Sequence, residues 1–402
     1  MTVCVNRISV GSSVSIMMES PKFKLVAITT VAVSMKAFYE GQFEAFNRAG
    51  FETFAICAED SEVSNFLPPE TKFIPVNFTR LVTPLKDIKL LWQLVGIFRK
   101  YNFDIVQYST PKAALLGAIA SFYTRVPIRI YLLWGLYYEG QHGVKRAILK
   151  FFEKVICFFS TRILPDSREM ISYIQQQGVT KGAKCGMIYN GSACAIDTEE
   201  FEPVKWSQSG EQLKSKLGIP KDGIVIGLFC RLTGDKGVNE MMTAFQRISQ
   251  ERPNVYLLVV GREEQKDRLP SGTMDVINNH HRVFRLGWQE TLLPCYAALD
   301  IFCLPSYREG FPQSLIEAQA MGVAVVTTNI VGARETIVNN QTGLLVEPKN
   351  SQTLYAALKK LLDNSQLRKE FAKNGRERVV KMFGRKEFLQ AMVTHHLNLL
   401  KN

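Results

Sequence analysis

The sequence has 402 residues, of which 46% are hydrophobic and 21% charged, proportions that exclude a disordered chain. A chain of this length exceeds what one hydrophobic core usually supports, so we expect two domains of about 200 residues each. The net charge of +12 favours an anionic partner such as a phosphorylated small molecule, an anionic membrane or a nucleic acid. No nucleic-acid motif or aromatic–basic repeat accompanies the charge, so nucleic acid is the least favoured of the three and is not predicted as a partner.

Cysteine and histidine usage points away from disulfides and metals. The eight cysteines include no Cys-x-x-Cys pair, which favours free thiols in a reducing cytosol. The five histidines show no metal-ligand spacing, so no metal is predicted. No window approaches the ~20 apolar residues that span a bilayer. Residues 1–20 are too weakly apolar for a signal peptide and are expected to be a poorly ordered tail, with Met17 or Met18 as an alternative start.

The first half of the chain alternates predicted strands with predicted helices. Strands are predicted at 24–30, 51–58, 72–78, 104–108, 129–134, 162–165 and 185–189, and helices at 38–49, 87–100, 112–123 and 167–177. Such alternation indicates βαβ units and a parallel sheet. The pattern stops near Asn190-Gly-Ser, and the polar stretch 196–210 is predicted to be an irregular hinge between domains.

The alternation begins again after Pro220. Strands are predicted at 224–230, 255–260, 283–286, 301–304, 324–327 and 343–346, and helices at 238–250, 291–299 and 313–321. We therefore predict an α/β fold of two doubly wound, Rossmann-like domains, 21–195 and 196–384, that face each other across a cleft. The last helix, within 385–402, follows the completed second pattern and is a candidate to pack back across the cleft.

One predicted helix, 144–159, combines apolar and basic residues. At 100° per residue its apolar members share one wide face: Val144, Ala147, Ile148, Phe151, Phe152, Val155, Phe158 and Phe159. Arg146, Lys150 and Lys154 share the opposite arc with Glu153. Such a helix can lie in a membrane interface, or it can be a core helix with a solvated basic face. Periodicity favours the core helix. The region between Arg80 and Arg168 has fourteen Lys and Arg against five Asp and Glu, and this positive charge makes the membrane-interface interpretation more competitive without making it the favoured one.

Two loops that follow predicted strands carry the candidate chemistry. Arg231 ends one strand and Lys236 precedes the next helix, while Glu309 follows the strand 301–304 and Glu317 lies in the second turn of the helix after it. Ligands collect at this end of parallel strands, and two cations there are suited to a diphosphate leaving group. The alternative is that the bases are solvated and the acids only complement a helix dipole.

These residues resemble the nucleotide-sugar site of the family 4 retaining glycosyltransferases, which have the GT-B fold. The matching motifs are Arg231-Leu-x-x-x-Lys236-Gly, Leu304-Pro-Ser-x-x-Glu309-Gly-Phe-Pro-x-x-x-x-Glu317-Ala-x-Ala-x-Gly322 and Gly332-x-x-Glu335-x-Ile. The resemblance implies that Arg231 and Lys236 bind the donor diphosphate. It implies that Glu309, with the amides of Gly310 and Phe311, holds the donor sugar, and that Glu317 holds the nucleotide ribose. Such enzymes use the nucleotide-sugar as co-substrate and need no metal or further cofactor.

The first half resembles a narrower group, the bacterial glycosyltransferases that build capsule, O-antigen and lipid-linked oligosaccharides. The motifs are Tyr108-Ser-Thr-Pro111-Lys112-Ala-Ala-Leu-Leu-Gly117, Arg129-Ile-Tyr-x-x-x-Gly135-Leu-x-Tyr-Glu139 and Asn190-Gly-Ser. This resemblance implies a polyprenyl-diphosphate-linked acceptor. It also implies a peripheral location on the inner face of the cytoplasmic membrane, with the first domain as the acceptor domain facing an anionic surface. The candidate acceptor-binding residues are Ser109, Lys112, Trp134, Tyr138 and Glu139.

Two features depart from the family pattern. The loop from Thr29 to Lys36 lacks the Gly-Gly pair that many members carry after the first strand, which puts its contact with the donor phosphate in doubt. Many members also carry a histidine that reaches the donor sugar, whereas the equivalent stretch here reads Leu133-Trp134-Gly135. Trp134 can take over a sugar contact or simply pack in the core, and the sequence favours neither.

The combined expectation is a retaining, metal-independent hexosyl- or N-acetylhexosaminyltransferase. It would move a sugar from a UDP-sugar to a polyprenyl-diphosphate-linked saccharide in bacterial surface polysaccharide or glycan assembly. The alternative is a nucleotide-sugar epimerase of the same fold, which would form product without an acceptor. A third hypothesis, a non-catalytic partner subunit, is disfavoured because all four donor residues are present.

Overall fold

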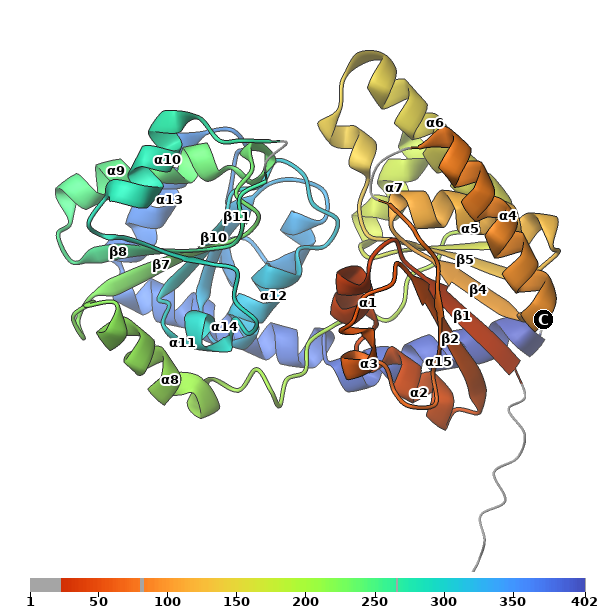
Figure 1. Ribbon diagram of the computed structural model, residues 1–402. Coiled ribbons are helices and arrows are strands. Elements are labelled where there is room, and N and C mark those ends of the chain that lie inside the picture. Colours follow the sequence, from red (N-terminus) through yellow and green to blue (C-terminus); the bar gives the residue numbers. More distant parts are fainter. Residues whose placement is uncertain (1–22, 80–82, 265–266, 402) are drawn as a thin grey trace, which may run out of the picture.

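The computed structural model describes residues 23–79, 83–264 and 267–401, so the tail predicted at 1–20 lies outside the described residues. Each half of the chain folds around its own parallel sheet (Figure 1). The first sheet has the order β3-β2-β1-β4-β5-β6. Its strands are β1 (Phe23–Ile28), β2 (Phe51–Cys57), β3 (Lys72–Pro75), β4 (Ile105–Tyr108), β5 (Ile128–Leu133) and β6 (Arg162–Pro165).

The second sheet repeats this plan with the order β12-β11-β10-β7-β8-β9. Its strands are β7 (Ile224–Phe229), β8 (Val255–Val260), β9 (Val283–Gly287), β10 (Ile301–Leu304), β11 (Ala324–Thr328) and β12 (Gly343–Val346). In each sheet the strand order reverses beside the first strand, next to β1 and next to β7, and doubly wound sheets bind ligands at such switch points. The predicted α/β class with two doubly wound sheets is confirmed.

Helices cover both faces of each sheet. Those of the first half are α1 (Ala32–Tyr39), α2 (Gln42–Arg48), α3 (Val63–Phe66), α4 (Pro84–Tyr101), α5 (Pro111–Tyr123), the 3₁₀ turn η1 (Tyr137–Gly140), α6 (Gly143–Phe159) and α7 (Arg168–Gln176). Those of the second half are α8 (Pro203–Lys216), η2 (Gly234–Lys236), α9 (Val238–Glu251), α10 (Ser271–Asn279), α11 (Leu293–Ala297), α12 (Gln313–Ala320), η3 (Ala333–Thr336), α13 (Ser351–Asp363), α14 (Ser365–Met382) and α15 (Arg385–Lys401). Because both sheet faces are covered, strands such as β4, β10 and β11 are buried at every residue and read in the sequence as short apolar runs.

Three sequence predictions of local structure are wrong. The helix predicted at 38–49 is two helices, α1 and α2, because Gly41 between them adopts a left-handed φ of 73°. The strand predicted at 185–189 is reduced to one bridge between Cys185 and Ile163, and Tyr189 turns the chain with a positive φ of 52°. The hinge predicted at 196–210 contains the start of α8, since Pro203 in its first turn is well placed to begin a helix. Helices α10, α13 and α14 were not predicted.

Helix α6 exposes its apolar residues. Val144, Ile148, Phe151 and Phe158 are between 49% and 77% exposed. The helix instead buries Glu153, Ile156 and Cys157, and Tyr131 of β5 donates a hydrogen bond of 2.9 Å to the Glu153 carboxylate. Burial raises the pKa of Glu153 to about 7, which lessens the cost of placing this acid in the core. The expectation of a core helix with a solvated basic face is therefore wrong.

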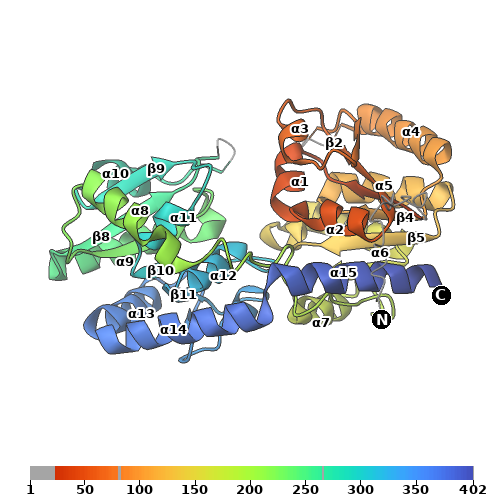
Figure 2. The ribbon, with the colours of Figure 1, turned by 90° about the horizontal axis from the view of Figure 1, so that it is seen from below.

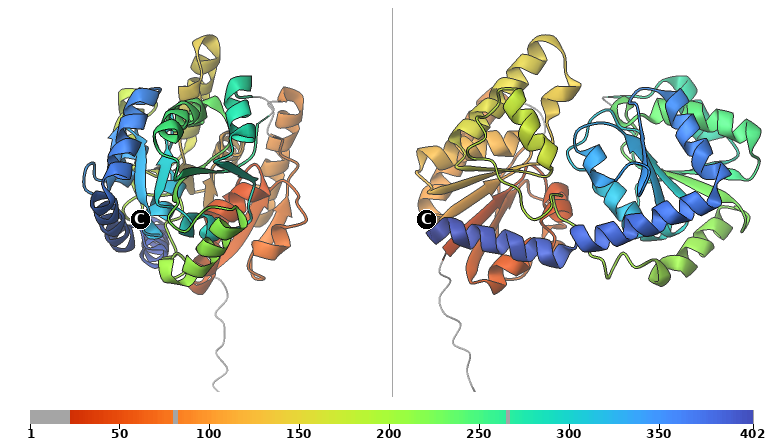
Figure 3. Two further views of the ribbon diagram at one scale, coloured as in Figure 1. Left: turned by 90° about the vertical axis from the view of Figure 1, so that its left-hand side faces the viewer. Right: turned by 180° about the vertical axis from the view of Figure 1, so that it is seen from behind.

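The last two helices join the halves. Helices α14 and α15 follow one another along one side of the molecule, with α14 on the second half and α15 on the first (Figures 2 and 3). Phe388 and Met392 of α15 are buried in the core beside β1 and β2. The fully buried His396 ring lies 3.1 Å from the side-chain oxygen of Gln107 in β4. Helix α15 thus belongs structurally to the first half although it is the last element of the chain.

Candidate active site

The carboxyl ends of β7 and β10 bring the two predicted loops together. Lys236 ends η2, in the loop after β7, and Glu309 lies in the loop after β10. The Lys236 ammonium donates a hydrogen bond of 2.6 Å to the Glu309 carboxylate, and both side chains are largely buried. A cation and a carboxylate from separate motifs therefore form one ion pair at the switch point of the second sheet.

Arg231 lies near this pair but is more open to solvent. Its side chain is 54% exposed, and its guanidinium lies 3.9 Å from the Glu264 carboxylate. Burial raises the pKa of the neighbouring Cys230 thiol to about 12, and this thiol also experiences the charges of Lys236, Glu309, Asp235 and Arg231. The predicted diphosphate-binding residues and the predicted sugar-binding carboxylate are thus grouped around Cys230.

Glycines allow the loops of this site to pack tightly. Gly237 has a φ of 68°, and a side-chain carbon there would collide with the Pro305 carbonyl oxygen. Gly332 has a φ of 82°, and a side-chain carbon there would collide with the Gly310 carbonyl oxygen. Both positions need glycine for backbone conformation and for space. The loops after β7, β10 and β11 consequently hold Glu309 and Gly310 in place.

Glu317 occupies a different environment. It lies in the second turn of α12, where the Tyr296 hydroxyl donates a hydrogen bond of 2.8 Å to its carboxylate. Burial raises the pKa of Glu317, and the nearby charges belong to Arg385, Glu200 and Glu40 at the junction of the two halves. Within the described part of the chain, no hydrogen bond or ion pair joins Glu317 to Lys236 or Glu309.

Asp166 is a site residue that the sequence reasoning missed. It directly follows β6, is 4% exposed and accepts a hydrogen bond from the Phe311 amide. Its carboxylate packs so closely on the β10 loop that a side-chain carbon at Gly310 would lie 2.6 Å away. The Phe311 amide, predicted to hold the donor sugar, is therefore directed to Asp166. An acid immediately after a buried strand was the available signal.

The candidate acceptor residues are placed very differently from one another. Ser109 and Tyr138 are completely buried, so neither side chain is presented to an acceptor in this arrangement. Lys112 pairs with Asp87 at 2.7 Å. The Trp134 ring packs against Phe38, with ring centroids 4.3 Å apart, which is the core-packing alternative of the sequence analysis.

Glu139 lines a cavity of about 530 Å³ between the two halves. The first half contributes Glu139, Gly140 and His142, and the second half contributes residues that include Asp235, Arg308 and Lys349. Burial raises the pKa of Glu139, while a hydrogen bond from Tyr173 and the Arg308 charge lower it. Glu139 thus shares this cavity with Asp235 and Arg308, the sequence neighbours of Lys236 and Glu309. The Trp134 backbone also approaches the pair, because its carbonyl lies against Gly310.

A third motif links the halves directly. The Glu335 carboxylate accepts hydrogen bonds from the Arg168 and Glu169 amides, at 3.0 and 2.7 Å, at the start of α7. Arg334 donates to the Glu169 carboxylate at 2.6 Å. A carboxylate at a helix N-terminus satisfies unpaired amides and complements the helix dipole. The Gly332-x-x-Glu335 motif therefore holds the first half against the donor loop.

Comparison with known proteins matches both halves to glycosyltransferases. Residues 209–378 match "Glycosyl transferases group 1" and residues 36–191 match "Glycosyl transferase 4-like domain". The capsular polysaccharide biosynthesis glycosyltransferase CapM of Staphylococcus aureus is 30% identical over 379 residues, which cover 94% of this chain and 98% of that protein. The chain belongs to the group 1 glycosyltransferases of family 4. This family is retaining, so the enzyme class predicted from the motifs is confirmed at that level.

Two further proteins are similar to most of the chain. An Escherichia coli protein named UDP-Gal:alpha-D-GlcNAc-diphosphoundecaprenol alpha-1,3-galactosyltransferase is 26% identical over 347 residues, covering 85% of this chain and 88% of that protein. The solved structure of a sucrose-phosphate synthase from Thermosynechococcus elongatus superposes with a TM-score of 0.77 at 20% identity, over 94% of this chain and all of that one. The second likeness confirms the GT-B fold.

The described residues contain neither a metal-binding cluster nor a membrane-spanning helix. No group of three or more His, Cys, Asp or Glu side chains in the described ranges is arranged to hold a metal ion. No helix within those ranges is long and apolar enough to cross a membrane.

The buried Asp166 should make stability depend on pH. Burial raises its pKa to about 8, so between pH 4 and 8 the folded state keeps a proton that the unfolded state has lost. Stability therefore falls as pH rises through this window, by up to about 1.4 kcal/mol per pH unit, and levels off above it. Asp166→Asn should raise the unfolding temperature relative to wild type more at pH 8 than at pH 5. The exposed Asp275→Asn is the control, and an equal offset for Asp166→Asn at both pH values would contradict the assignment.

Proposed function

We propose that this family 4 glycosyltransferase moves a hexosyl or N-acetylhexosaminyl group from a UDP-sugar to a saccharide linked to polyprenyl diphosphate, with retention of configuration. The observation that carries the proposal is the grouping of Arg231, Lys236 and Glu309 at the switch point of the second sheet. Its support in the relatives is that the E. coli protein is named for a UDP-galactose donor and a diphosphoundecaprenol acceptor. The S. aureus protein is named for capsular polysaccharide biosynthesis.

The geometry supports a reaction by positioning and electrostatics. The bond between the sugar's anomeric carbon and the diphosphate oxygen breaks on the face where the acceptor oxygen attacks. The departing phosphate oxygen takes the acceptor proton, so the reaction needs no side-chain nucleophile. Lys236 and Arg231 stabilise the charge that develops on the diphosphate, while Glu309, 2.6 Å from Lys236, orients the hydroxyls of the adjacent sugar.

Two more residues receive proposed roles. Glu317, buried in the second turn of α12, is assigned to the ribose of the donor nucleotide because of the family resemblance of its motif. Glu139, in the cavity between the halves, is assigned to the acceptor saccharide because that cavity adjoins the loop that carries Glu309. The structure gives no comparable support for Ser109 or Tyr138, which are buried.

The proposed acceptor is lipid-linked, and helix α6 supplies a surface that suits a membrane. Its exposed Val144, Ile148 and Phe151 are flanked by the exposed bases Lys145 and Lys154. Exposed apolar residues beside lysines favour insertion into the interface of an anionic bilayer. We therefore assign the membrane contact to this face of the first half.

Donor binding is the most direct test of the proposed function. A ligand that binds only the folded protein raises its unfolding temperature according to concentration and affinity. We expect UDP-sugars to stabilise the protein and GDP-sugars not to, and we expect transfer product only when a polyprenyl-diphosphate-linked saccharide is added. Product from the donor alone would favour the epimerase alternative, and the absence of stabilisation by any nucleotide-sugar would revive the non-catalytic subunit.

A further inference from the structure

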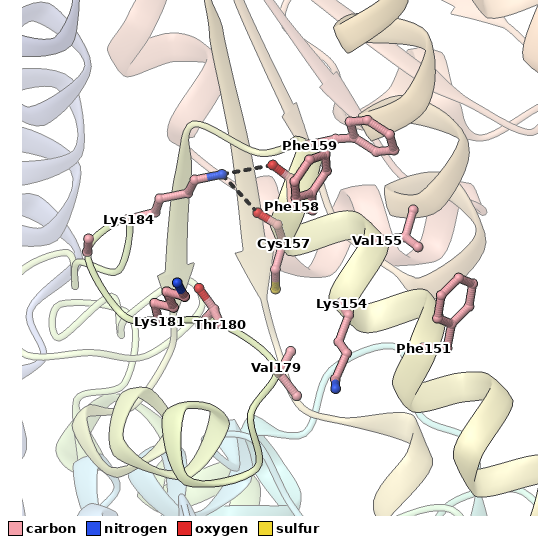
Figure 4. Close-up of a pocket in the computed structure, with 11 residues that line it drawn as sticks. Phe151, Lys154, Val155, Cys157, Phe158, Phe159, Val179, Thr180, Lys181 and Lys184 are labelled. Atoms are coloured by element: carbon pink, nitrogen blue, oxygen red, sulfur yellow. Dashed lines mark hydrogen bonds between the residues drawn. The ribbon is translucent and has the colours of Figure 1, made fainter.

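The C-terminal end of α6 borders a cavity of about 690 Å³ (Figure 4). One wall is the last turns of α6, and the other is the segment that follows α7. Its volume lies within the range of about 300–1,000 Å³ that is typical of sites for small organic ligands. The lining residues are Phe151, Lys154, Val155, Cys157, Phe158, Phe159, Val179, Thr180, Lys181, Ala183 and Lys184.

The chemistry of this cavity is apolar with a cationic rim. Five of its eleven lining residues are phenylalanine or valine, and every ionisable side chain other than Cys157 is a lysine. Lys184 donates hydrogen bonds to the carbonyl oxygens of Cys157 and Phe158 and so caps the end of α6. Lys154 on the helix wall and Lys181 on the loop wall form no ion pair among the described residues. A ligand that suits such a site has a hydrocarbon chain and an anionic group.

We propose that this cavity binds one anionic membrane phospholipid, with an acyl chain against the apolar wall and the phosphate between Lys154 and Lys181. The cavity lies at the end of an apolar row on α6 that is exposed except at the partly buried Val155. Val144, Ile148, Phe151, Val155 and Phe158 follow one another at intervals of four and three residues, so they lie along one side of the helix. The row extends from the proposed membrane contact to the cavity, so a lipid of the bilayer can enter the cavity directly from the membrane.

The cavity lies away from the point where the acceptor reacts. Helix α6 has 17 residues and is therefore about 25 Å long. The segment just before its first turn adjoins the cavity between the two halves, where Gly140 lies against the Arg308 side chain. The reacting hydroxyl of the acceptor lies near that end, whereas Lys154 and Lys181 lie toward the opposite end. The membrane contact that leads to the cavity rests on the proposed function, but lipid binding is measured without sugar transfer, so the two proposals can fail separately.

Calorimetric titration with short-chain lipids below their critical micelle concentrations tests the proposal. Dihexanoylphosphatidylglycerol should bind at least tenfold more tightly than dihexanoylphosphatidylcholine, and inorganic phosphate alone should not bind measurably. Lengthening the buried chain by one methylene should tighten binding about fourfold until the cavity is filled. Equal binding of the two lipids, or no gain from the longer chain, would overturn the proposal.

Variants locate the binding. Ala183→Trp places a large ring in the cavity and Lys154→Glu/Lys181→Glu reverses the charge of its rim, so each should weaken phosphatidylglycerol binding at least tenfold. Lys89→Glu, the same charge change on an exposed lysine of α4 outside the cavity, should leave it within twofold of wild type. The double charge variant alters only exposed side chains, so it keeps the test valid if Ala183→Trp does not fold. Unchanged lipid binding in the double charge variant would overturn the proposal. The proposal would also be overturned if light scattering showed that the wild-type protein forms a dimer without lipid and that the double charge variant is a monomer. Stabilisation by UDP, measured on the same samples, reports separately on the donor site.

Discussion

Replacing Lys236 or Glu309 by alanine should lower kcat by about 100- to 1,000-fold. This is the range found when one preorganised group that stabilises transition-state charge is removed from an active site. The two side chains form an ion pair of 2.6 Å with little exposure to solvent, so each single variant also leaves its partner as an uncompensated charge. The measurements are the rate of sugar transfer with saturating donor and acceptor and the unfolding temperature of each variant.

The double variant Lys236→Ala/Glu309→Ala separates chemistry from folding. Because it removes both charges, it should be at least as stable as either single variant, while its activity should fall no further than that of the worse one. Lys373 and Glu377 form a matched control pair, 3.9 Å apart and well exposed on α14. Alanine at either control position should change stability and turnover little, as exposed pairs contribute weakly. Near-normal turnover in both single variants would show that Lys236 and Glu309 are not part of the active site.

The two-sheet fold was predictable because parallel strands covered on both faces are mostly apolar. The runs 224–230 and 301–304 therefore stood out in the sequence and correspond to β7 and β10. Since parallel strands end at the same edge, the loops that follow adjacent strands had to meet. The sequence pattern therefore predicts that Lys236 and Glu309 lie at one sheet edge, and the two side chains are in contact there.

Other features depend on contacts that periodicity does not record. Glu153 lies on the buried side of α6, where a hydrogen bond from Tyr131 and a raised pKa make its burial tolerable. The helix therefore packs on the sheet with the side that contains Glu153, and not with the more hydrophobic side that periodicity predicts. The position of Asp166 after a buried strand marks it as a candidate, but its contact with the Phe311 amide of the second half is long-range and leaves no trace in the sequence pattern. Similarly, the spacing of Glu309 and Glu317 could not show that Glu317 is bonded to Tyr296 and surrounded by a different set of charges.

Membrane binding should weaken sharply when the exposed apolar row of α6 is made polar near its start. Val144→Ser/Ile148→Ser removes two side chains that are 77% and 49% exposed and lie outside the lipid cavity. If each contributes about 1 kcal/mol to insertion in the interface, binding to vesicles should fall roughly 30-fold. Co-sedimentation with vesicles that contain phosphatidylglycerol measures this, and phosphatidylcholine vesicles show how much of the binding depends on charge.

The outcome distinguishes a membrane surface from an incidental apolar face. Val204→Ser, at a residue 79% exposed on α8 of the second half, is the matched control and should leave vesicle binding unchanged. Because α6 would act by bringing the enzyme to its lipid-linked acceptor, Val144→Ser/Ile148→Ser should slow transfer to an acceptor embedded in vesicles. Transfer to a short-chain acceptor in solution should continue at the normal rate, since Lys236 and Glu309 are untouched. Loss of both activities would indicate damage to the fold, and loss of neither would mean that α6 does not bring the enzyme to the membrane.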